Sequence, residues 1–200
     1  MEILNLEQGT QEWFEARKLK MTASNATAIA NCGSGLETYI YELCSEFFSK
    51  AEKDHYSNDD IERGNILESE ARSIYEFETG NSVKEVGFCL YDEFSGCSPD
   101  GLVNDDGLVE FKCKNDKNHL KQIIKGEKAI ESSYMWQMQM QMLVTGRRWC
   151  DFVCYNPNFE KHTLIFRVNA DDEKHAKIKE GLEKGKSIIK TIMSKMGNEQ

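Results

Sequence analysis

The stretch "SPDGLVNDDGLVEFKC", residues 98–113, places three charged side chains in a segment that otherwise has the composition of buried strands. Apolar residues lie on both sides of the turn-forming "NDDG", a pattern that predicts a β-hairpin. Side chains alternate between the two faces of a strand, so Glu110 and Lys112 share one face and the apolar residues share the other. A hairpin that closes at this turn brings Asp100 near both.

Two carboxylates and an ammonium group in one place predict a specific chemistry. Partly buried carboxylates repel each other unless a cation lies between them, and a site with few oxygen ligands suits Mg²⁺, which keeps several waters and binds phosphate oxygens. Such an ion lowers the pKa of bound water and neutralises charge on a phosphorane, with Lys112 placed to orient or deprotonate that water. Asp100, Glu110 and Lys112 therefore predict phosphodiester hydrolysis.

The same residues also have a simpler interpretation. An acid-x-lysine pattern is common, and the chain contains another at residues 172–174, in a charge-rich segment typical of a solvated helix start. A hairpin that carries only a surface ion pair also explains the spacing.

The composition indicates one domain without disulfides. The chain has 200 residues, is 40% hydrophobic and carries a net charge of −9, which predicts a single domain spanning residues 1–200. It contains no apolar run of about eighteen residues, so the protein is expected to be soluble and intracellular, with no membrane partner. Its seven cysteines form no CxxC pair, which argues against a zinc site. The negative charge argues against a protein that coats nucleic acid by bulk electrostatics, so any DNA contact must be local.

Hydrophobic periodicity predicts helices before and after a group of strands. Gly80 is expected to cap the helix that precedes the first of these strands. This order indicates an α/β fold with a central mixed β-sheet flanked by helices. Helices are expected at residues 10–19, 22–31, 36–50, 61–80, 118–126, 131–145 and 173–195, and strands at residues 83–91, 96–103, 107–113, 149–156 and 162–168.

A third acidic side chain, Glu68, lies in the helix expected at residues 61–80. Arg72 follows four residues later, so an i,i+4 surface ion pair is one interpretation. The other interpretation is that Glu68 supplies a third carboxylate to the metal cluster.

Polar residues interrupt the apolar helix expected at residues 131–145. Tyr134, Gln137 and Gln141 lie along one face of this helix, beside methionines that are expected to fill the core. An unpaired buried amide costs about 1–3 kcal/mol, so Gln137 is expected to have a polar partner. A water or a phosphate in an active site would be such a partner.

Arg17 and Ser24 flank "KLKMTA" near the N-terminus. Considered separately, Arg17 is explained as a surface charge and Ser24 as a helix cap. Together at the start of a helix, they would grip a phosphate through the guanidinium group, the hydroxyl and backbone N–H groups.

Four segments of the chain together resemble the phage lambda exonuclease and YqaJ-like viral recombinase family, a branch of the PD-(D/E)xK nuclease superfamily. "EWFEARKLKMTAS" is similar to the family's N-terminal Trp…Arg…Thr-Ala-Ser segment, "ILESEARSIYEFETG" to its acidic helix, "SPDG" with "LVEFKC" to its metal motif, and "SYMWQMQMQMLVTG" to its Gln-bearing helix. The likeness covers about three quarters of the chain, in the family's order. One departure is Lys18 and Lys20, which add positive charge where the family has Leu-Gly after the arginine.

The resemblance implies a restriction-endonuclease-like core and an active site with Mg²⁺, or Mn²⁺ in its place, and two ions per site. Asp100 and Glu110 would bind metal beside the backbone carbonyl of Phe111, and Glu68 would complete a second metal site. Lys112 would activate the attacking water.

The resemblance also implies a substrate and partners. The enzyme would degrade one strand of double-stranded DNA from a 5′-phosphorylated end to mononucleotides and leave a 3′ single-stranded tail for a phage single-strand-annealing protein. Gln137 would assist Lys112, and Arg17, Ser24 and Ser98 would hold the 5′-phosphate. A ring-shaped homotrimer would act in the cytoplasm of a bacterial host, from a phage or prophage gene.

Three other functions use related features. A sequence- or structure-specific DNA endonuclease on the same core would cut a closed circle, whereas an exonuclease needs an end. An iron–sulfur nuclease of the superfamily would need a cysteine cluster near the C-terminus, and no cysteine follows Cys154. A non-catalytic DNA-end-binding recombination protein would not need the complete acid–acid–lysine set.

Overall fold

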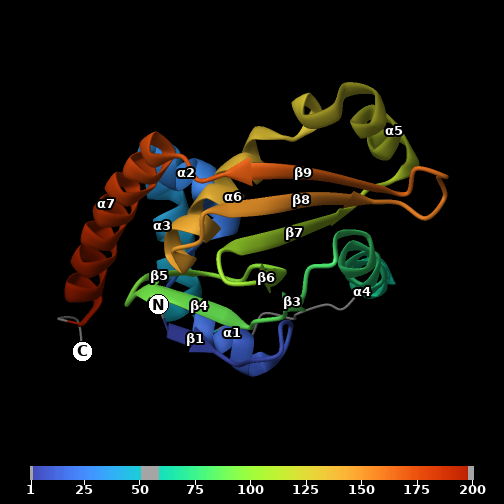
Figure 1. Ribbon diagram of the computed structural model, residues 1–200. Helices are drawn as coiled ribbons and strands as arrows, with labels where there is room; N and C mark the ends of the chain where they lie inside the picture. Colours follow the sequence, from blue (N-terminus) through green and yellow to red (C-terminus); the bar gives the residue numbers. More distant parts are fainter. Residues whose placement is uncertain (1, 51–58, 198–200) are drawn as a thin grey trace.

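The chain folds into two mixed β-sheets with helices packed around them (Figure 1). The computed structural model describes residues 2–50 and 59–197, and of residues 59–65 only the backbone. The α/β class expected from the sequence is confirmed, but two sheets take the place of the single central sheet.

The first sheet consists of four short strands. In spatial order these are β1 (Glu2–Leu4), β4 (Phe88–Asp92), β5 (Ser95–Cys97) and β2 (Met21–Thr22). β4 pairs antiparallel with β1 and β5, whereas β5 and β2 are parallel. Residues from the N-terminal segment are therefore held against residues that follow them by about 70 positions.

The second sheet contains the predicted hairpin and the two longest strand pairings. In spatial order its strands are β3 (Val83–Lys84), β6 (Gly101–Val103), β7 (Gly107–Cys113), β8 (Trp149–Tyr155) and β9 (Thr163–Asn169). β6 and β7 pair antiparallel, as expected, and only β7 and β8 are parallel.

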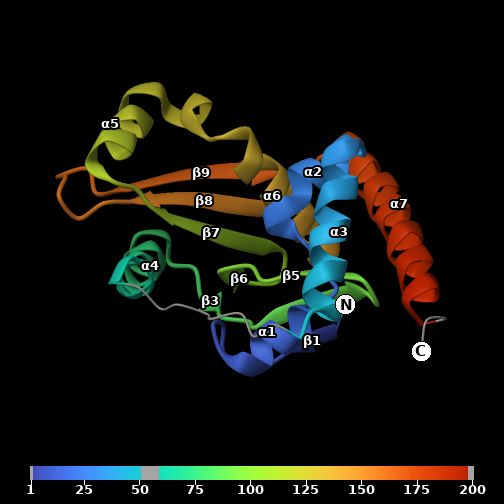
Figure 2. The ribbon, with the colours of Figure 1, turned by 180° about the vertical axis from the view of Figure 1, so that it is seen from behind.

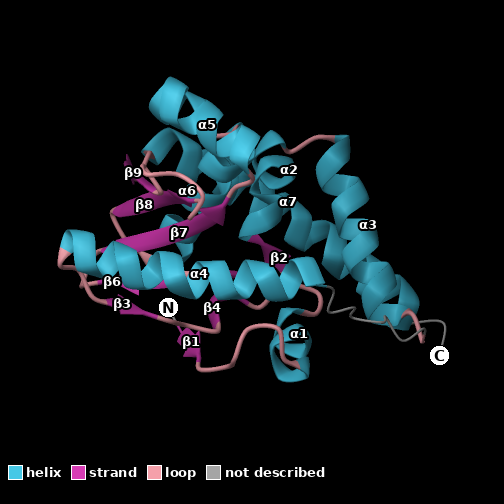
Figure 3. Ribbon diagram, turned by 90° about the vertical axis from the view of Figure 1, so that its right-hand side faces the viewer, coloured by secondary structure: helices cyan, strands magenta, loops and turns pink. Residues whose placement is uncertain are grey.

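Different helices cover the two faces of the second sheet. α6 (Ser132–Thr145) packs on one face, where Leu108 and Phe152 belong to the larger hydrophobic core. α4 (Asp59–Thr79) lies across the strands on the other face, where Val109 and Phe111 form a smaller core with Tyr75 (Figure 3). Because side chains alternate along β7, the charged residues of the hairpin face α6.

The remaining helices pack around the first sheet and the ends of the second. Viewed from behind, α2, α3 and α7 lie together on one side of the molecule (Figure 2). No helix in the described ranges is long and apolar enough to cross a membrane. These elements are α1 (Gln11–Arg17), α2 (Ala26–Asn31), α3 (Ser34–Phe48), α5 (Asp116–Lys125) and α7 (Asp172–Gly197), with the short 3₁₀ helices η1 (Ala23–Asn25) and η2 (Gly126–Ala129).

Two of the expected strands are each divided between the two sheets. Residues 83–91 form β3 and the start of β4, and residues 96–103 form the end of β5 and all of β6. Pro99 lies at the second break, because a proline has no N–H to donate to a strand ladder. The helix expected at residues 22–31 is also shorter, since its first residues form the end of β2 and η1.

The end of α4 agrees with the expected cap. Gly80 follows its last residue with a φ of +67°, and its N–H donates to the Glu76 carbonyl at 2.9 Å. A left-handed residue at this position is reached most easily by glycine.

A glycine in α7 permits its close approach to α2. A Cβ atom at Gly181 would overlap the carbonyl oxygen of Ile29, which belongs to α2. Ile178 and Leu182 of the same helix are buried beside this contact. Close packing of the two helices therefore depends on the missing side chain.

Gly181→Ala should lower the free energy of unfolding by about 1–3 kcal/mol, because the added methyl group pushes α7 away from α2. Gly35→Ala is a matched control, since that glycine also lies in a helix but has open space around it. The control should leave stability unchanged or raise it by up to about 1 kcal/mol. Urea denaturation measures both, and equal stability of Gly181→Ala and wild type would contradict the close packing.

Candidate active site

Glu110 lies at the centre of the predicted site and is fully buried, with 0% of the residue exposed. Lys112 Nζ and Gln137 Nε2 donate to its Oε1, each at 2.6 Å, and Gln141 Nε2 donates to its Oε2 at 2.7 Å. A buried carboxylate needs such donors, because removal from water strongly disfavours its charge. The interpretation of the hairpin as carrying only a surface ion pair is therefore wrong.

Asp100 lies in the loop between β5 and β6, next to Glu110. β6 pairs with β7 so that Gly101 is opposite Val109, and the preceding residue therefore comes beside Glu110. Oδ2 of Asp100 accepts the backbone N–H of Phe111 at 2.7 Å. The hairpin thus brings the two carboxylates together, as the sequence predicted.

Glu68 approaches the site from α4. Its Oε1 accepts a hydrogen bond from Arg72 at 3.1 Å, and Arg72 also pairs with Glu85. The i,i+4 ion pair considered from the sequence is therefore present. Burial raises the pKa of Glu68, Arg72 opposes this rise, and the charge of Glu110 adds to it. Glu68 is thus close enough to Glu110 to be affected by its charge.

The charged groups of the site act strongly on one another. Burial raises the pKa of Asp100 well above its ordinary value, and the nearby charge of Glu110 raises it further. Burial alone would lower the pKa of Lys112, but Glu110 and Asp100 outweigh this effect and raise it above its ordinary value. Lys112 is therefore a cation at neutral pH. Its single positive charge does not neutralise all of the carboxylates around it.

The chemistry of this set fits a hard divalent cation. The side-chain ligands would all be carboxylate oxygens, and the repulsion between these groups favours an ion such as Mg²⁺ between them. Within the described residues, no three His, Cys, Asp or Glu side chains are grouped closely enough to hold a metal as they stand. The oxygens of Glu110 accept hydrogen bonds from Lys112, Gln137 and Gln141, so an ion would share Glu110 with these donors or displace them.

Two residues predicted to bind phosphate, Arg17 and Ser98, are in direct contact. An Arg17 guanidinium N–H donates to Ser98 Oγ at 3.2 Å, and Trp13 Nε1 donates to the same hydroxyl at 3.0 Å. The guanidinium group also lies over the Trp13 ring, 4.1 Å from its centroid. The Arg17 fork is therefore held in place before any ligand binds.

Ser24, the third predicted phosphate ligand, lies farther out. It is exposed, and its hydroxyl shares a hydrogen bond with Thr22 at 3.1 Å. A cleft of about 980 Å³ between α1, η1 and α3 is lined by both Arg17 and Ser24, together with Lys18 and Lys20. The two lysines that depart from the family pattern thus add positive charge to this cleft.

The loop of residues 98–100 joins the two halves of the site. Ser98 at its start contacts Arg17, and Asp100 at its end contacts β7. Gln8 Nε2 donates to the carbonyl of Pro99 between them, at 3.3 Å. The loop also carries the chain from the first sheet to the second, so each sheet supplies one half of the site.

The buried thiol of Cys97, just before this loop, is affected by both halves. Burial raises the pKa of the Cys97 thiol, and Cys89 raises it further. The charge of Glu110 also raises this pKa, whereas the charge of Arg17 lowers it. Because Ser98, which contacts Arg17, is only two residues from Asp100, the guanidinium half and the carboxylate half lie close together.

Two residues of the site were not assigned a role from the sequence. Gln141 binds Glu110 as closely as Gln137 does, and its position one turn along the same helical face was the available signal. Trp13 supports both Arg17 and Ser98, and its signal was the i,i+4 spacing from Arg17 on a short helix.

Asp100→Asn should stabilise the metal-free protein near neutral pH. The folded protein binds the Asp100 proton more tightly than the unfolded chain, in which the pKa is about 3.9, so the ionised carboxylate destabilises the fold as the pH rises above that value. Thermal unfolding in a chelator should show a higher Tm for the variant at about pH 7.5, and the gain should shrink toward pH 4.

Asp105→Asn is the matched control, because Asp105 is exposed in the turn of the same hairpin. It should give no such pH-dependent gain. An Asp100→Asn variant that is less stable than wild type at every pH would contradict the proposed crowding of charge.

Comparison with known proteins agrees with this geometry. Residues 12–148 match the YqaJ-like viral recombinase domain, whereas no curated protein sequence matches the chain significantly. The crystal structure of an alkaline exonuclease from Laribacter hongkongensis matches with a TM-score of 0.78 and 34% identity, over 96% of this chain and 100% of that chain. The same enzyme in complex with dAMP matches over the same shares, with a TM-score of 0.78 and 35% identity.

A phage-related exonuclease from Haemophilus somnus 129PT shares the fold, with a TM-score of 0.69 and 18% identity over 91% of this chain and 98% of that one. The family match covers more than half of the chain, and the Laribacter enzyme matches nearly all of it. The chain therefore belongs to the YqaJ-like viral recombinase family, as its four motifs indicated.

Proposed function

We propose that the protein is a Mg²⁺-dependent exonuclease that degrades one strand of linear double-stranded DNA from its 5′ end, releases mononucleotides and leaves a 3′ single-stranded tail. The observation that carries this proposal is the loop of residues 98–100, which connects a guanidinium–hydroxyl pair to a group of acids and a lysine. Family membership supports nuclease chemistry. The relative from Laribacter is an alkaline exonuclease whose structure was also solved with dAMP, a mononucleotide.

The acidic half of the site would hold the metal. Asp100, Glu110 and the backbone carbonyl of Phe111 would bind one Mg²⁺, and Glu68 would contribute to a second, with Mn²⁺ as a substitute. When bound, such ions lower the pKa of water and stabilise negative charge on the phosphoryl group. Burial, together with the charge of Glu110, raises the pKa of Asp100 and of Glu68, and this supports the assignment.

Lys112 would orient the attacking water. Its ammonium group, held by Glu110 at 2.6 Å, can donate a hydrogen bond to a water or a phosphate oxygen. Gln137 would assist from α6, where its amide is held beside the same carboxylate.

Arg17, Ser24 and Ser98 would bind the terminal 5′-phosphate. A guanidinium fork beside a hydroxyl suits a phosphate group, and Trp13 keeps both in place. Because Ser98 is only two residues from Asp100, the phosphate would be held at a fixed separation from the acids. Cleavage would then fall one nucleotide from the end, and release of each product would let the strand advance.

The positive charge that a DNA duplex requires would be supplied locally. α5 and η2 follow β7 and expose four lysines in a chain whose net charge is −9. These side chains would contact backbone phosphates near the site. They are Lys117, Lys121, Lys125 and Lys128.

The proposed assembly follows from family likeness. A single exonuclease domain would form a homotrimeric ring around DNA, and such enclosure would let an acidic protein remain on its substrate between cuts. A phage single-strand-annealing protein would take over the 3′ tail, in the cytoplasm of a bacterial host.

Lys112→Ala should reduce digestion of a linear duplex by at least about a hundredfold, because the attacking water loses its orienting cation. Binding to 5′-phosphorylated ends should persist, since the phosphate half of the site is intact. Lys174→Ala is the matched control, because it removes the lysine of the other acid-x-lysine pattern and should digest DNA like wild type.

The measurement uses end-labelled linear duplex with Mg²⁺ and a chelator control. Normal turnover by Lys112→Ala would reject the role of that lysine. Cutting of closed circular DNA by wild type would favour the endonuclease alternative.

Arg17→Ala should remove the preference for phosphorylated over hydroxyl 5′ ends, so that the ratio of the two rates falls to about one. Lys179→Ala is the control, since it removes an exposed positive charge of α7 that does not line the cleft beside Arg17. Rates on the two kinds of end measure the ratio, and an Arg17→Ala variant with the wild-type ratio would contradict the assignment.

A further inference from the structure

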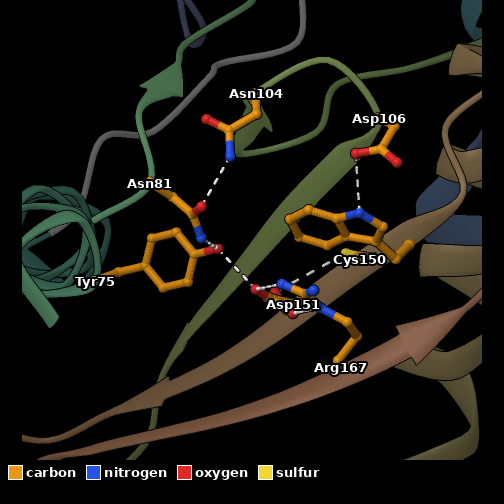
Figure 4. A network of polar contacts seen from close by, with 8 residues as sticks. Tyr75, Asn81, Asn104, Asp106, Cys150, Asp151 and Arg167 are labelled. Atoms are coloured by element: carbon orange, nitrogen blue, oxygen red, sulfur yellow. Dashed lines mark hydrogen bonds and ion pairs between the residues drawn. The ribbon is translucent and has the colours of Figure 1, made fainter. Parts of the chain in front are cut away.

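A buried aspartate that the proposed reaction does not use lies on the opposite face of the second sheet. Asp151 of β8 is 2% exposed. Its Oδ1 accepts from Arg167 Nε at 2.8 Å, and its Oδ2 accepts from a second Arg167 nitrogen at 2.9 Å and from the Tyr75 hydroxyl at 2.7 Å (Figure 4). The Asp151 carboxylate therefore forms a bidentate ion pair with Arg167 of β9, and its third hydrogen bond comes from Tyr75 of α4.

The tyrosine hydroxyl is held from two sides. Tyr75 is 0% exposed and donates to Asp151, while Asn81 Nδ2 donates to the same hydroxyl at 3.1 Å. Asn104, in the β6–β7 turn, donates in turn to Asn81 Oδ1 at 2.8 Å. Because hydrogen bonds are directional, this series of hydrogen bonds fixes the position of α4 more sharply than apolar contacts do.

The arginine of the network is also restrained. Its guanidinium carbon lies 3.6 Å from the centroid of the Trp149 ring, and Trp149 Nε1 donates to Asp106 at 3.1 Å. Arg167 therefore presents a fixed partner to Asp151, although half of its side chain is exposed.

The ring of Tyr75 connects this network to the acids. It packs edge-on against Phe111, with 6.0 Å between the ring centroids. Phe111 lies between Glu110 and Lys112 in β7, and its backbone N–H donates to Asp100. Tyr75 thus supports the strand segment whose other face carries the acids.

The same tyrosine is also aligned with Glu68. The two residues are seven positions apart in α4, which is about two turns, so they lie on nearly the same face of the helix. A hydrogen bond at Tyr75 therefore sets both the rotation of α4 and its height above the sheet. Both settings determine where the carboxylate of Glu68 lies relative to Glu110.

We infer that Asp151 and Tyr75 are positioning residues, which hold α4 so that Glu68 stays beside Glu110 and can contribute to a second metal site when the ions bind. This inference rests on the proposed function. It goes further by assigning part of the metal affinity to a polar network on the far face of the sheet.

Tyr75→Phe tests the inference, because it keeps the ring against Phe111 and removes only the hydroxyl. Mn²⁺ binding, followed by electron paramagnetic resonance, should weaken about tenfold at the weaker site, the size typical of losing a residue that orients a metal ligand. kcat on a linear duplex should fall by a similar factor, whereas KM for DNA ends should change less than twofold. The double variant with Asp151→Asn should be no worse than the more impaired single variant, because both changes break one network.

Asp106→Ala is the matched control, since it removes the side-chain acceptor for Trp149 and leaves the hydrogen bond from Tyr75 to Asp151 intact. Its Mn²⁺ affinity should equal that of wild type. If Tyr75→Phe loses thermal stability but binds Mn²⁺ like wild type, the network has only a structural role. That result would overturn this inference and leave the proposed function unaffected. A wild-type protein that neither binds Mn²⁺ nor degrades DNA would overturn the proposed function as well.

Discussion

The burial of a charged carboxylate, Glu110, is the constraint on which the rest of the site depends. A central strand that places this group inside the molecule requires donors for both of its oxygens, and α6 supplies two amides from successive turns while β7 supplies an ammonium group. Apolar packing alone would let α6 slide over the sheet, whereas these bonds fix its register. The polar residues that interrupt an otherwise apolar helix are thus explained by one acid.

Each of the two sheets holds a different part of the site. The short first sheet holds the N-terminal segment with Arg17 near Ser98, and the longer second sheet holds the acids. Because one loop crosses between them at Pro99, a small shift of either sheet would change the separation between the proposed phosphate site and the acids. An enzyme that measures one nucleotide from an end would need such a fixed separation, and the loop is bonded at both ends and at its middle.

Local patterns predicted the parts of this structure that depend on neighbouring residues. Strand alternation predicted the faces of Glu110 and Lys112, and Gly80 ends α4 as expected. The division into two sheets was not predictable, because β5 pairs with β2 from a distant part of the chain and no local signal specifies that partner. Asp151 was missed for the same reason, since an acid in a strand looks like an ordinary outward-facing residue until Tyr75 and Arg167 are placed beside it.

A crystal structure grown with Mn²⁺ tests the proposed metal site most directly, because anomalous scattering locates the metal without reference to activity. We expect an anomalous peak bound by oxygens of both Asp100 and Glu110, with Lys112 adjacent. Carboxylates that keep their hydrogen bonds to Lys112, Gln137 and Gln141 at high Mn²⁺, with no peak between them, would contradict it.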